Sequence, residues 1–314
     1  MEEYYYKKLD SENIKDLVPI YKLAFNKEVS EEYLIKKNST EAFGLSFTGF
    51  IAYHIQTNEA AAFYGVFPCL IKYEDQIIRA AQSGDTMTHP KHQGKGLFIK
   101  LAKMTYDYVK ENGVQCVFGF PNKNSYPGFV RKLDWEHIED MQAWLVRVKC
   151  LSWARCKKMF HLPDSLFWLN TRFVLALCKK GKVPFQNSVI SEDIAGIERN
   201  ADFFKYKTYE KNYVISVKGK SVWIKPDTSF FKIGDMEHCT EREFRAIVRR
   251  LKILAFFMGL PYLRYHCSPG TYFEKMFAEH GRKHDATFPV GWVNFNSPFK
   301  LEQLKFTMCD NDTF

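Results

Sequence analysis

The segment THPKHQGKGLF, residues 88–98, combines residue types that together bind anions. Gly94 and Gly96 allow the backbone to become left-handed and to approach a bulky ligand, and two lysines add positive charge. The segment lies between an apolar, β-like run and a periodic apolar pattern at 97–111, so we expect a strand, a turn and a helix. The start of such a helix presents free N–H groups and the positive end of the helix dipole. The sequence therefore predicts an anion site suited to a pyrophosphate.

The spacing of the glycines disfavours the two better-known phosphate turns. A P-loop requires GxxxxGK[ST], and a dinucleotide turn requires GxGxxG with an acidic residue about 20 positions later. Here Gly94-Lys95-Gly96 is followed by Leu97 and Phe98 without a third glycine. We therefore do not expect a nucleoside triphosphate or a dinucleotide. A turn that binds no ligand remains the alternative.

Metal chemistry is not favoured by the histidines or the cysteines. His89 and His92 lie three residues apart with no cysteine or carboxylate set beside them. The eight cysteines are scattered and form no CxxC pair, which is typical of buried thiols in a reducing cytosol. The acidic, aromatic start of the sequence does not resemble a secretory signal. We expect a cytoplasmic protein with no metal.

The composition is globular, with 46% hydrophobic and 26% charged residues, and the length of 314 residues suits two domains. The net charge of +9 favours an anionic partner without selecting its class. In the first half, apolar patterns and turn residues predict an α+β domain over 1–148. Its expected elements are a helix at 11–25, a strand meander over 43–88, a helix at 97–111, a strand at 114–120 and a short helix at 129–135.

Residues 149–185 differ in character. From Arg147 to Lys182 there are nine lysines and arginines against one acidic residue, with aromatic side chains between them. We expect a helical connector between two domains. Its 13-residue apolar stretch is too short to span a bilayer. An interfacial helix on an anionic membrane, through residues 149–183, is the alternative.

Residues 186–314 predict a second α+β domain that repeats the order of the first at an offset of about 150 residues. Thr240 and Glu243 form a capping-box pattern that starts a helix ending near Met258. The other expected elements are strands at 213–219, 221–226, 230–238, 262–267, 288–295 and 304–308, and a loop and helix over 267–281. The fold class expected is α+β, with two similar mixed-sheet domains.

The glycine turn resembles the acyl-CoA signature of the GNAT superfamily of N-acyltransferases, Gln/Arg-x-x-Gly-x-Gly/Ala. Gln93 takes the first position, Gly96 the central glycine, and Phe98 the last position, where glycine or alanine is usual. The resemblance covers about residues 5–147. The internal repeat is similar to the tandem arrangement of the enhanced-intracellular-survival type of acetyltransferase.

The resemblance implies that acetyl-coenzyme A binds at the turn. Met87 and Thr88 would pair with the pantetheine like a neighbouring strand, and Asn122 and Ser125 would reach it from the next loop. Phe98 narrows the path by which the phosphates approach the turn. Since the backbone N–H groups are what bind the phosphates, we expect an altered geometry of the bound pyrophosphate and not loss of the site. The pyrophosphate would bind backbone amides from Gln93, Gly94, Lys95, Gly96, Leu97 and Phe98.

The resemblance also raises the question of the general acid. In the family a tyrosine often protonates the leaving thiolate, but Val130 occupies that position here, and Asp134 stands where a glycine is usual. Tyr126 is the nearest substitute, and a packing role before Pro127 is its alternative. A coenzyme thiolate also leaves without an acid, so none is strictly required.

Three groups are candidates for the base that deprotonates the amine. Asp85 lies on the strand that enters the turn, where the family often carries a carboxylate; a structural turn aspartate is the alternative. His89 is a lesser candidate. By analogy with the enhanced-survival enzymes, whose terminal carboxylate lies in the active site, Phe314 is a third, and a frayed tail is its alternative.

The second half lacks the glycines. Glu237, Glu241 and Glu243 surround the start of its corresponding helix, where they would satisfy the N–H groups and repel a pyrophosphate. We expect a degenerate copy that shapes the acceptor pocket and binds no coenzyme A.

The predicted function is transfer of an acetyl group from acetyl-CoA to a primary amine by direct attack. The acceptor class left open is an amino sugar, an aminoglycoside-like amine or a lipid-linked saccharide precursor. One alternative is aminoacyl transfer from tRNA, although a nucleic-acid partner is not expected. The other is a non-catalytic acyl-CoA-binding module. The sequence does not indicate an oligomeric state.

Overall fold

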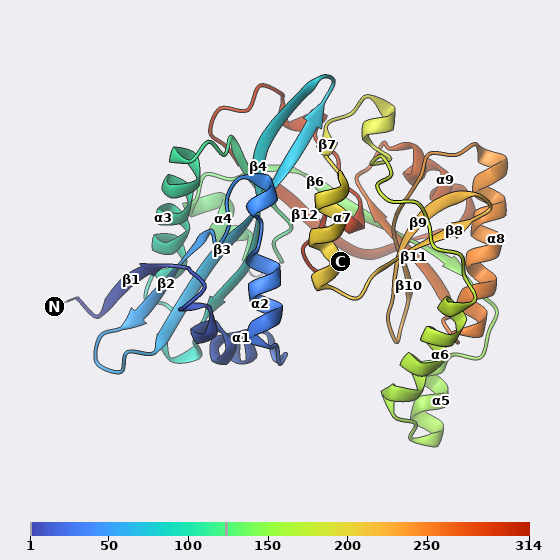
Figure 1. Ribbon diagram of the computed structural model, residues 1–314, viewed down its shortest axis with the longest axis horizontal. Coiled ribbons are helices and arrows are strands. Elements are labelled where there is room, and N and C mark those ends of the chain that lie inside the picture. Colours follow the sequence, from blue (N-terminus) through green and yellow to red (C-terminus); the bar gives the residue numbers. More distant parts are fainter. Residues whose placement is uncertain (1, 123–124) are drawn as a thin grey trace. The chain divides into compact units, whose positions relative to one another are not determined.

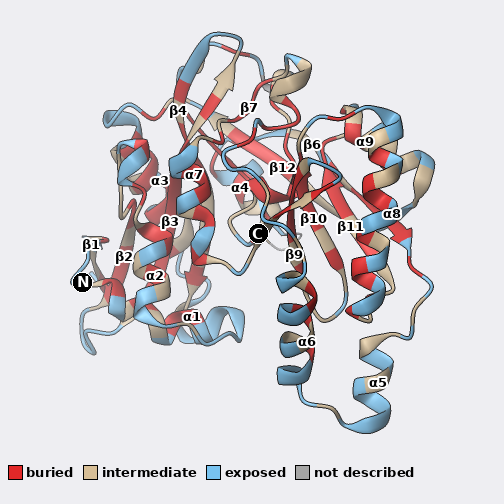
Figure 2. Ribbon diagram, turned by 45° about the vertical axis from the view of Figure 1, so that its right-hand side comes forward, coloured by how far each residue is buried: buried red, intermediate tan, exposed pale blue. Residues whose placement is uncertain are grey.

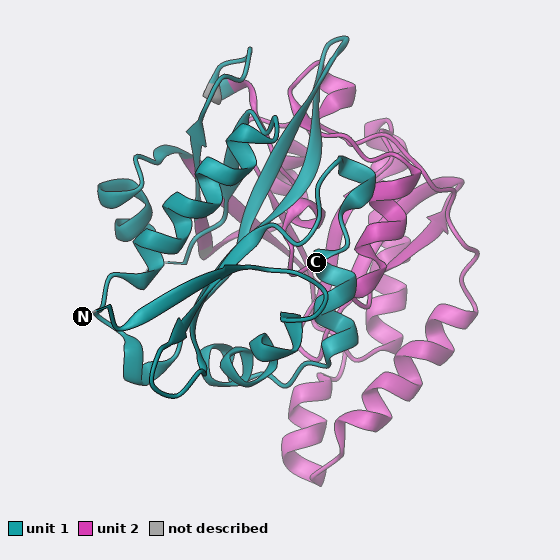
Figure 3. Cartoon of the chain, turned by 60° about the vertical axis from the view of Figure 1, so that its left-hand side comes forward, with its two compact units in different colours: residues 1–138, 289–302 teal, residues 139–288, 303–314 magenta. Residues whose placement is uncertain are grey.

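The computed structural model describes residues 2–122 and 125–314. The chain divides into two compact units, residues 1–138 with 289–302 and residues 139–288 with 303–314 (Figure 3). Each unit combines a mixed β-sheet with helices, as the α+β expectation required. Figure 1 labels the elements along the chain.

The sheet of unit 1 follows the order β1-β2-β3-β4-β5-β12. β4 and β5 are parallel, and the other described pairs of this unit are antiparallel. The strands are β1 (Tyr4–Lys8), β2 (Gly49–His54), β3 (Ala60–Tyr73), β4 (Gln76–Thr88), β5 (Cys116–Gly119) and β12 (Arg282–Asn294), whose last residues belong to this unit. The helices are α1 (Leu17–Phe25), α2 (Glu31–Asn38), α3 (Leu97–Glu111) and α4 (Tyr126–Lys132).

Both faces of this sheet are covered. Alternate residues of a strand point to opposite faces, and on β3 Tyr64 packs toward α3 while Phe63 packs toward α1 and α2. The run around them is therefore apolar without interruption, as expected for a strand buried on both sides. α3 contributes Leu97, Leu101 and Val109 at helical spacing. This packing fixes the start of α3 against the end of β4.

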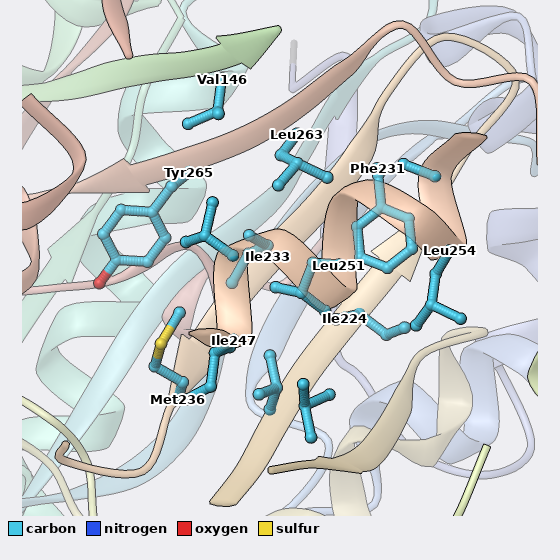
Figure 4. Packing of buried hydrophobic residues seen from close by; sticks show 14 of the residues in the cluster. Val146, Ile224, Phe231, Ile233, Met236, Ile247, Leu251, Leu254, Leu263 and Tyr265 are labelled. Atoms are coloured by element: carbon cyan, nitrogen blue, oxygen red, sulfur yellow. The ribbon is translucent and has the colours of Figure 1, made fainter. Parts of the chain in front are cut away.

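The sheet of unit 2 follows the order β6-β11-β10-β9-β8, with β10 and β11 parallel. Ile247 and Leu251 of α8 pack on Ile233 and Leu263 of the sheet, and Figure 4 shows this core. The strands are β6 (Glu136–Arg147), β7 (Gly196–Ile197), β8 (Tyr213–Val217), β9 (Lys220–Pro226), β10 (Phe231–Met236) and β11 (Tyr262–Cys267). The helices are α5 (Trp153–Phe160), α6 (Asp164–Ala176), α7 (Ala201–Tyr206), α8 (Glu241–Phe257) and α9 (Tyr272–His280).

The basic and aromatic segment forms α5 and α6. No residue of α5 is buried, whereas Phe167, Thr171 and Val174 anchor α6 (Figure 2). Phe160 and Phe173 are among the exposed apolar side chains of this segment. Within the described residues, no helix has the length and apolar character needed to cross a membrane.

Several elements differ from the sequence expectation. The helix expected at 129–135 begins earlier, at Tyr126, and β1, α2, β6, β7 and α7 were not predicted. The strand expected at 304–308 is wrong: Leu304 and Thr307 make only isolated bridges. A 3₁₀ turn, Met308–Asp310, follows. Its cause is a capping box between Thr307 and Asp310, which turns the chain out of the extended form.

The C-terminal segment is not frayed, contrary to the default expectation for a tail. Arg199, fully buried, donates to Thr307 Oγ1 at 2.7 Å and to Asp310 Oδ1 at 2.7 Å, and it also pairs with Asp235. The ring of Phe314 is buried in unit 2, 6.1 Å from the ring of Trp223. Buried ion pairs and an aromatic anchor therefore hold this segment in place.

Lys207 gives this segment a pH dependence. Its buried ammonium donates to the carbonyl of Asn311 at 2.5 Å, and burial lowers the pKa of Lys207 from 10.5 to about 8. Between these values the folded chain binds fewer protons than the unfolded chain, so the unfolding free energy rises with pH. We expect the unfolding free energy of the wild type, minus that of Lys207→Met, to rise by about 2 kcal/mol from pH 7.5 to 10. Urea unfolding of both proteins at each pH measures this, and a flat or falling difference would contradict it.

Candidate functional site

The glycine turn lies between the end of β4 at Thr88 and the start of α3 at Leu97, as the sequence predicted. Gly94 and Gly96 have φ of 77° and 74°, in the left-handed region that glycine adopts without strain. A Cβ atom built on either residue meets nothing within 4 Å. The backbone conformation therefore favours glycine here, and the space in front of the turn is open.

The first turn of α3 has no side-chain cap. Gly96 is its N-cap residue and supplies no hydrogen bond to the N–H groups behind it. The contrast is α8 of unit 2, where Thr240 accepts from the Glu243 N–H and Glu243 accepts from the Thr240 N–H. The N–H groups of α3 thus face open space with the helix dipole behind them, which suits an anion.

The charge beside the turn is partly compensated. The Lys95 ammonium lies 3.3 Å from the Glu3 carboxylate, and both side chains are about half exposed. His92 accepts from or donates to the Tyr4 hydroxyl at 2.8 Å, and burial together with the nearby His54 and His89 lowers the pKa of His92. The backbone amides and Lys95 therefore supply more of the positive potential than His92 does. No group of metal-ligating side chains occurs among the described residues.

The edge of β4 beside the turn is open to a strand-like ligand. Among the residues that the structure describes, β5 pairs with β4 from Ala81 to Ser83, and residues 84–88 run beyond the last of these pairs. A bulge shifts the β3–β4 register between Gly84 and Met87, and Asp85 within it has a φ of 47°. An extended chain could pair with the backbone of Met87 and Thr88 along this edge.

Phe98 is packed on neighbouring elements. Its ring lies edge-on to Phe129 with centroids 5.1 Å apart, and 6.0 Å from the ring of Tyr64. A Cβ atom at Gly128 would come within 3.0 Å of this ring, so glycine permits the contact. The side chain is therefore directed toward the α3 and α4 core, while its N–H remains at the helix start.

The loop before α4 is organised by Asn122. Its Oδ1 accepts from the Ser125 N–H at 3.0 Å, and its carbonyl accepts from the Tyr126 N–H at 3.0 Å. The ring of Tyr126 lies edge-on to His137, 5.7 Å away. The expected coenzyme contacts Asn122 and Ser125 and the candidate acid Tyr126 thus belong to one local structure. Residues 123 and 124 lie outside the described residues.

Asp85 has a buried partner that sequence reasoning missed. The Lys37 ammonium on α2 lies 2.8 Å from Asp85 Oδ1, with side-chain exposures of 1% and 6%. A neighbouring ammonium favours the ionised carboxylate and so weakens it as a base. The signal for α2 was present in Ser30, which caps the helix by accepting from Tyr33, followed by two glutamates.

A buried hydroxyl network behind the open edge of β4 was also missed. Tyr64 bonds Ser83 at 2.7 Å and Tyr106 at 2.9 Å, and the Trp135 indole donates to Tyr106 at 2.9 Å. Burial raises the pKa of both tyrosines, so they stay neutral. Ser83 is the last residue of β4 that pairs with β5, so this network fixes the point where the two strands separate.

Phe314, the third catalytic candidate, belongs to unit 2. Its backbone oxygen accepts from Asn212 Nδ2 at 3.4 Å, and a Cβ atom at Gly234 would clash with its ring. Gly234 lies at a bulge of β10, as Gly84 lies at the bulge of β4. The Phe314 ring thus packs against the β10 bulge at Gly234 in unit 2. Its catalytic role stays a prediction.

A family model described as the acetyltransferase (GNAT) domain matches residues 5–138. This range contains the glycine turn, the open edge of β4 and the Asn122 loop. No curated protein sequence is significantly similar to the chain.

Solved structures share the fold over nearly the whole chain. A GCN5-related N-acetyltransferase from Kribbella flavida is 9% identical with a TM-score of 0.61, covering 94% of this chain and 72% of that one. One from Anabaena variabilis is 13% identical with a TM-score of 0.57, covering 93% and 73%. Saccharomyces cerevisiae N-myristoyltransferase, solved with myristoyl-CoA, is 9% identical with a TM-score of 0.57, covering 96% and 84%. At these identities the likeness shows the GNAT fold. Residues 5–138 thus match the model of a family that uses acyl-CoA donors.

Proposed function

We propose that this GNAT-domain protein transfers an acetyl group from acetyl-CoA to a primary amine of a small molecule or sugar. The observation that carries the proposal is the glycine turn at the start of α3, which has left-handed backbone, no cap and open space before it. A turn of this kind fits a pyrophosphate and leaves the helix dipole uncompensated without one. The match of residues 5–138 to the GNAT domain supports the same donor.

In the proposed complex the turn from Gln93 to Phe98 holds the pyrophosphate through backbone N–H groups. The pantetheine runs along β4 at Met87 and Thr88, and Asn122 and Ser125 face it from the loop before α4. This arrangement is supported by the unpaired edge of β4 beyond Ser83. It places the thioester near the bulge at Asp85, where the β3–β4 register shifts.

The chemistry proposed is direct attack of the neutral amine on the thioester, which expels the coenzyme thiolate. Tyr126 is the proposed acid for that thiolate, because it lies in the same local structure as Asn122 and Ser125. Asp85 and the Phe314 carboxylate are the proposed acceptors of the amine proton. Asp85 is the weaker of these two because Lys37 stabilises its ionised form.

We propose a tandem arrangement, with a catalytic domain at 1–148, a connector at 149–185 and a degenerate GNAT-like domain at 186–314. Two observations support degeneracy: Thr240 and Glu243 already cap α8, and the Phe314 ring packs on Gly234 at the corresponding bulge. The protein is proposed to be cytoplasmic. Exposed Phe160 and Phe173 among basic side chains support peripheral contact of residues 149–183 with an anionic membrane.

A thiol-release screen tests this function. We expect the protein to liberate free coenzyme A from acetyl-CoA with at least one amine from a panel of amino sugars, polyamines, aminoglycosides and peptides. Tyr126→Phe is expected to lower kcat by about 10²-fold or more if the tyrosine is the acid. Binding of acetyl-CoA without thiol release across the panel would instead identify a non-catalytic acyl-CoA-binding module.

A further inference from the structure

Unit 2 contains a cavity of about 760 Å³ that the proposed acetyl transfer does not use. It lies between α6, the segment 179–184, the start of α7 and strands β8 and β9. Its volume falls in the range of small-molecule sites, about 300–1,000 Å³.

The inner wall of the cavity is aromatic and aliphatic. The rings of Phe204 and Trp223 stack with centroids 4.4 Å apart, and both residues are buried. Ile215 lies beside them, and Leu175 of α6 and Val214 of β8 complete the apolar lining. The Trp223 indole N–H is already satisfied by Asn212 Oδ1 at 2.9 Å. The inner wall thus suits an apolar group.

The rim of the cavity is cationic. Arg172, Lys179, Lys180 and Lys205 line it and are exposed, and no aspartate or glutamate does so. None of these four side chains forms an ion pair within the part of the chain that the structure describes.

The backbone holds part of this rim in place. The Gly181 N–H donates to the Val214 carbonyl at 3.0 Å, and the Ser216 N–H donates to the Lys179 carbonyl at 2.8 Å. Residues 179–181 therefore follow β8 as a short extended edge. This pairing fixes the positions of Lys179 and Lys180 relative to the cavity.

We propose that this cavity binds a single-chain anionic amphiphile, with its apolar chain against Phe204 and Trp223 and its anionic head on the lysines of the rim. Burial of the chain removes apolar surface from water, and the head neutralises cations that otherwise have no counter-charge. A cationic amphiphile is repelled by the same rim, and a neutral one gains only the apolar contribution. The site lies wholly in unit 2 and goes beyond the proposed acetyl transfer.

The test titrates the full chain with laurate below its micelle concentration, by calorimetry and by tryptophan fluorescence. Dodecyltrimethylammonium and dodecyl maltoside provide cationic and neutral heads on the same chain, and dodecyl phosphate distinguishes a phosphate from a carboxylate head. We expect laurate or dodecyl phosphate to bind at least tenfold more tightly than the cationic and neutral amphiphiles. Equal affinity for the four compounds, or no binding of either anion, would overturn the proposal.

Variants separate the two parts of the site. Lys179→Gln combined with Lys205→Gln is expected to weaken laurate binding at least tenfold, since each lysine offers a charge-assisted hydrogen bond. Lys283→Gln, an exposed unit 2 lysine outside the cavity, is the matched control and should bind as wild type. Ala201→Trp fills the cavity from its exposed edge and should abolish binding. Unchanged affinity in the double lysine variant would refute the anionic head, and this outcome is readable because exposed substitutions leave the fold intact.

Discussion

Gly96→Glu is expected to weaken acetyl-CoA binding at least 100-fold, about 2.7 kcal/mol, with little effect on folding. The new carboxylate lies at the start of α3, where it competes with the pyrophosphate for the free N–H groups and repels its charge. Because nothing lies within 4 Å of a Cβ atom at this position, the side chain has room in the folded protein. The strain of a glutamate at a φ of 74° costs about 1 kcal/mol, and the favourable interaction of its carboxylate with the helix dipole offsets part of this strain.

Gly219→Glu is the matched control for that variant. Gly219 also has a left-handed φ, 84°, and open space at Cβ, but it lies in the turn between β8 and β9 of unit 2. It therefore reproduces the strain and the added charge without altering the α3 turn. Calorimetric titration with acetyl-CoA should show wild-type affinity for Gly219→Glu. Undiminished affinity in Gly96→Glu would refute the coenzyme site at this turn.

The turn and its helix were predictable because their signals are local. Gly96 followed by the apolar spacing of Leu97, Leu101 and Val109 defines the start and the buried face of α3. The Thr240 and Glu243 pair likewise defined the start of α8 within four residues. In both places the sequence pattern and the packing favour the same structure.

What escaped prediction depends on contacts between distant residues. Lys37 and Asp85 are 48 positions apart, and only the folded sheet and α2 bring them together. The orientation of the Phe98 ring depends on Gly128, which lies on another helix. The strand pattern at 304–308 was overridden by Thr307, Asp310 and the buried Arg199. Periodicity alone contains no information about such partners, so it misassigned or missed these features.

Phe314→Ala is expected to lower the unfolding free energy by about 3–5 kcal/mol. The ring is fully buried against Gly234 and Trp223, so truncation leaves a cavity beside the β10 bulge. Phe314→Leu should cost less because it retains part of the volume. Phe257→Ala is the control, since that ring is 62% exposed and its loss should change stability by no more than about 0.5 kcal/mol.

Phe314→Leu separates the two roles proposed for Phe314, the anchoring of its ring and the catalytic role of its carboxylate. Urea unfolding measures the effect of changing the ring. Thiol release measures the role of the carboxylate, which Phe314→Leu retains at the same position. We expect Phe314→Leu to keep wild-type kcat with reduced stability. Calorimetry of Phe314→Ala should show no second coenzyme site, because Thr240 and Glu243 still cap α8 after the β10 bulge is opened. A stability loss below about 1 kcal/mol in Phe314→Ala would contradict the anchoring role of the ring. A second equivalent of bound acetyl-CoA would show that the Phe314 ring, and not the cap of α8, is what keeps coenzyme A out of unit 2.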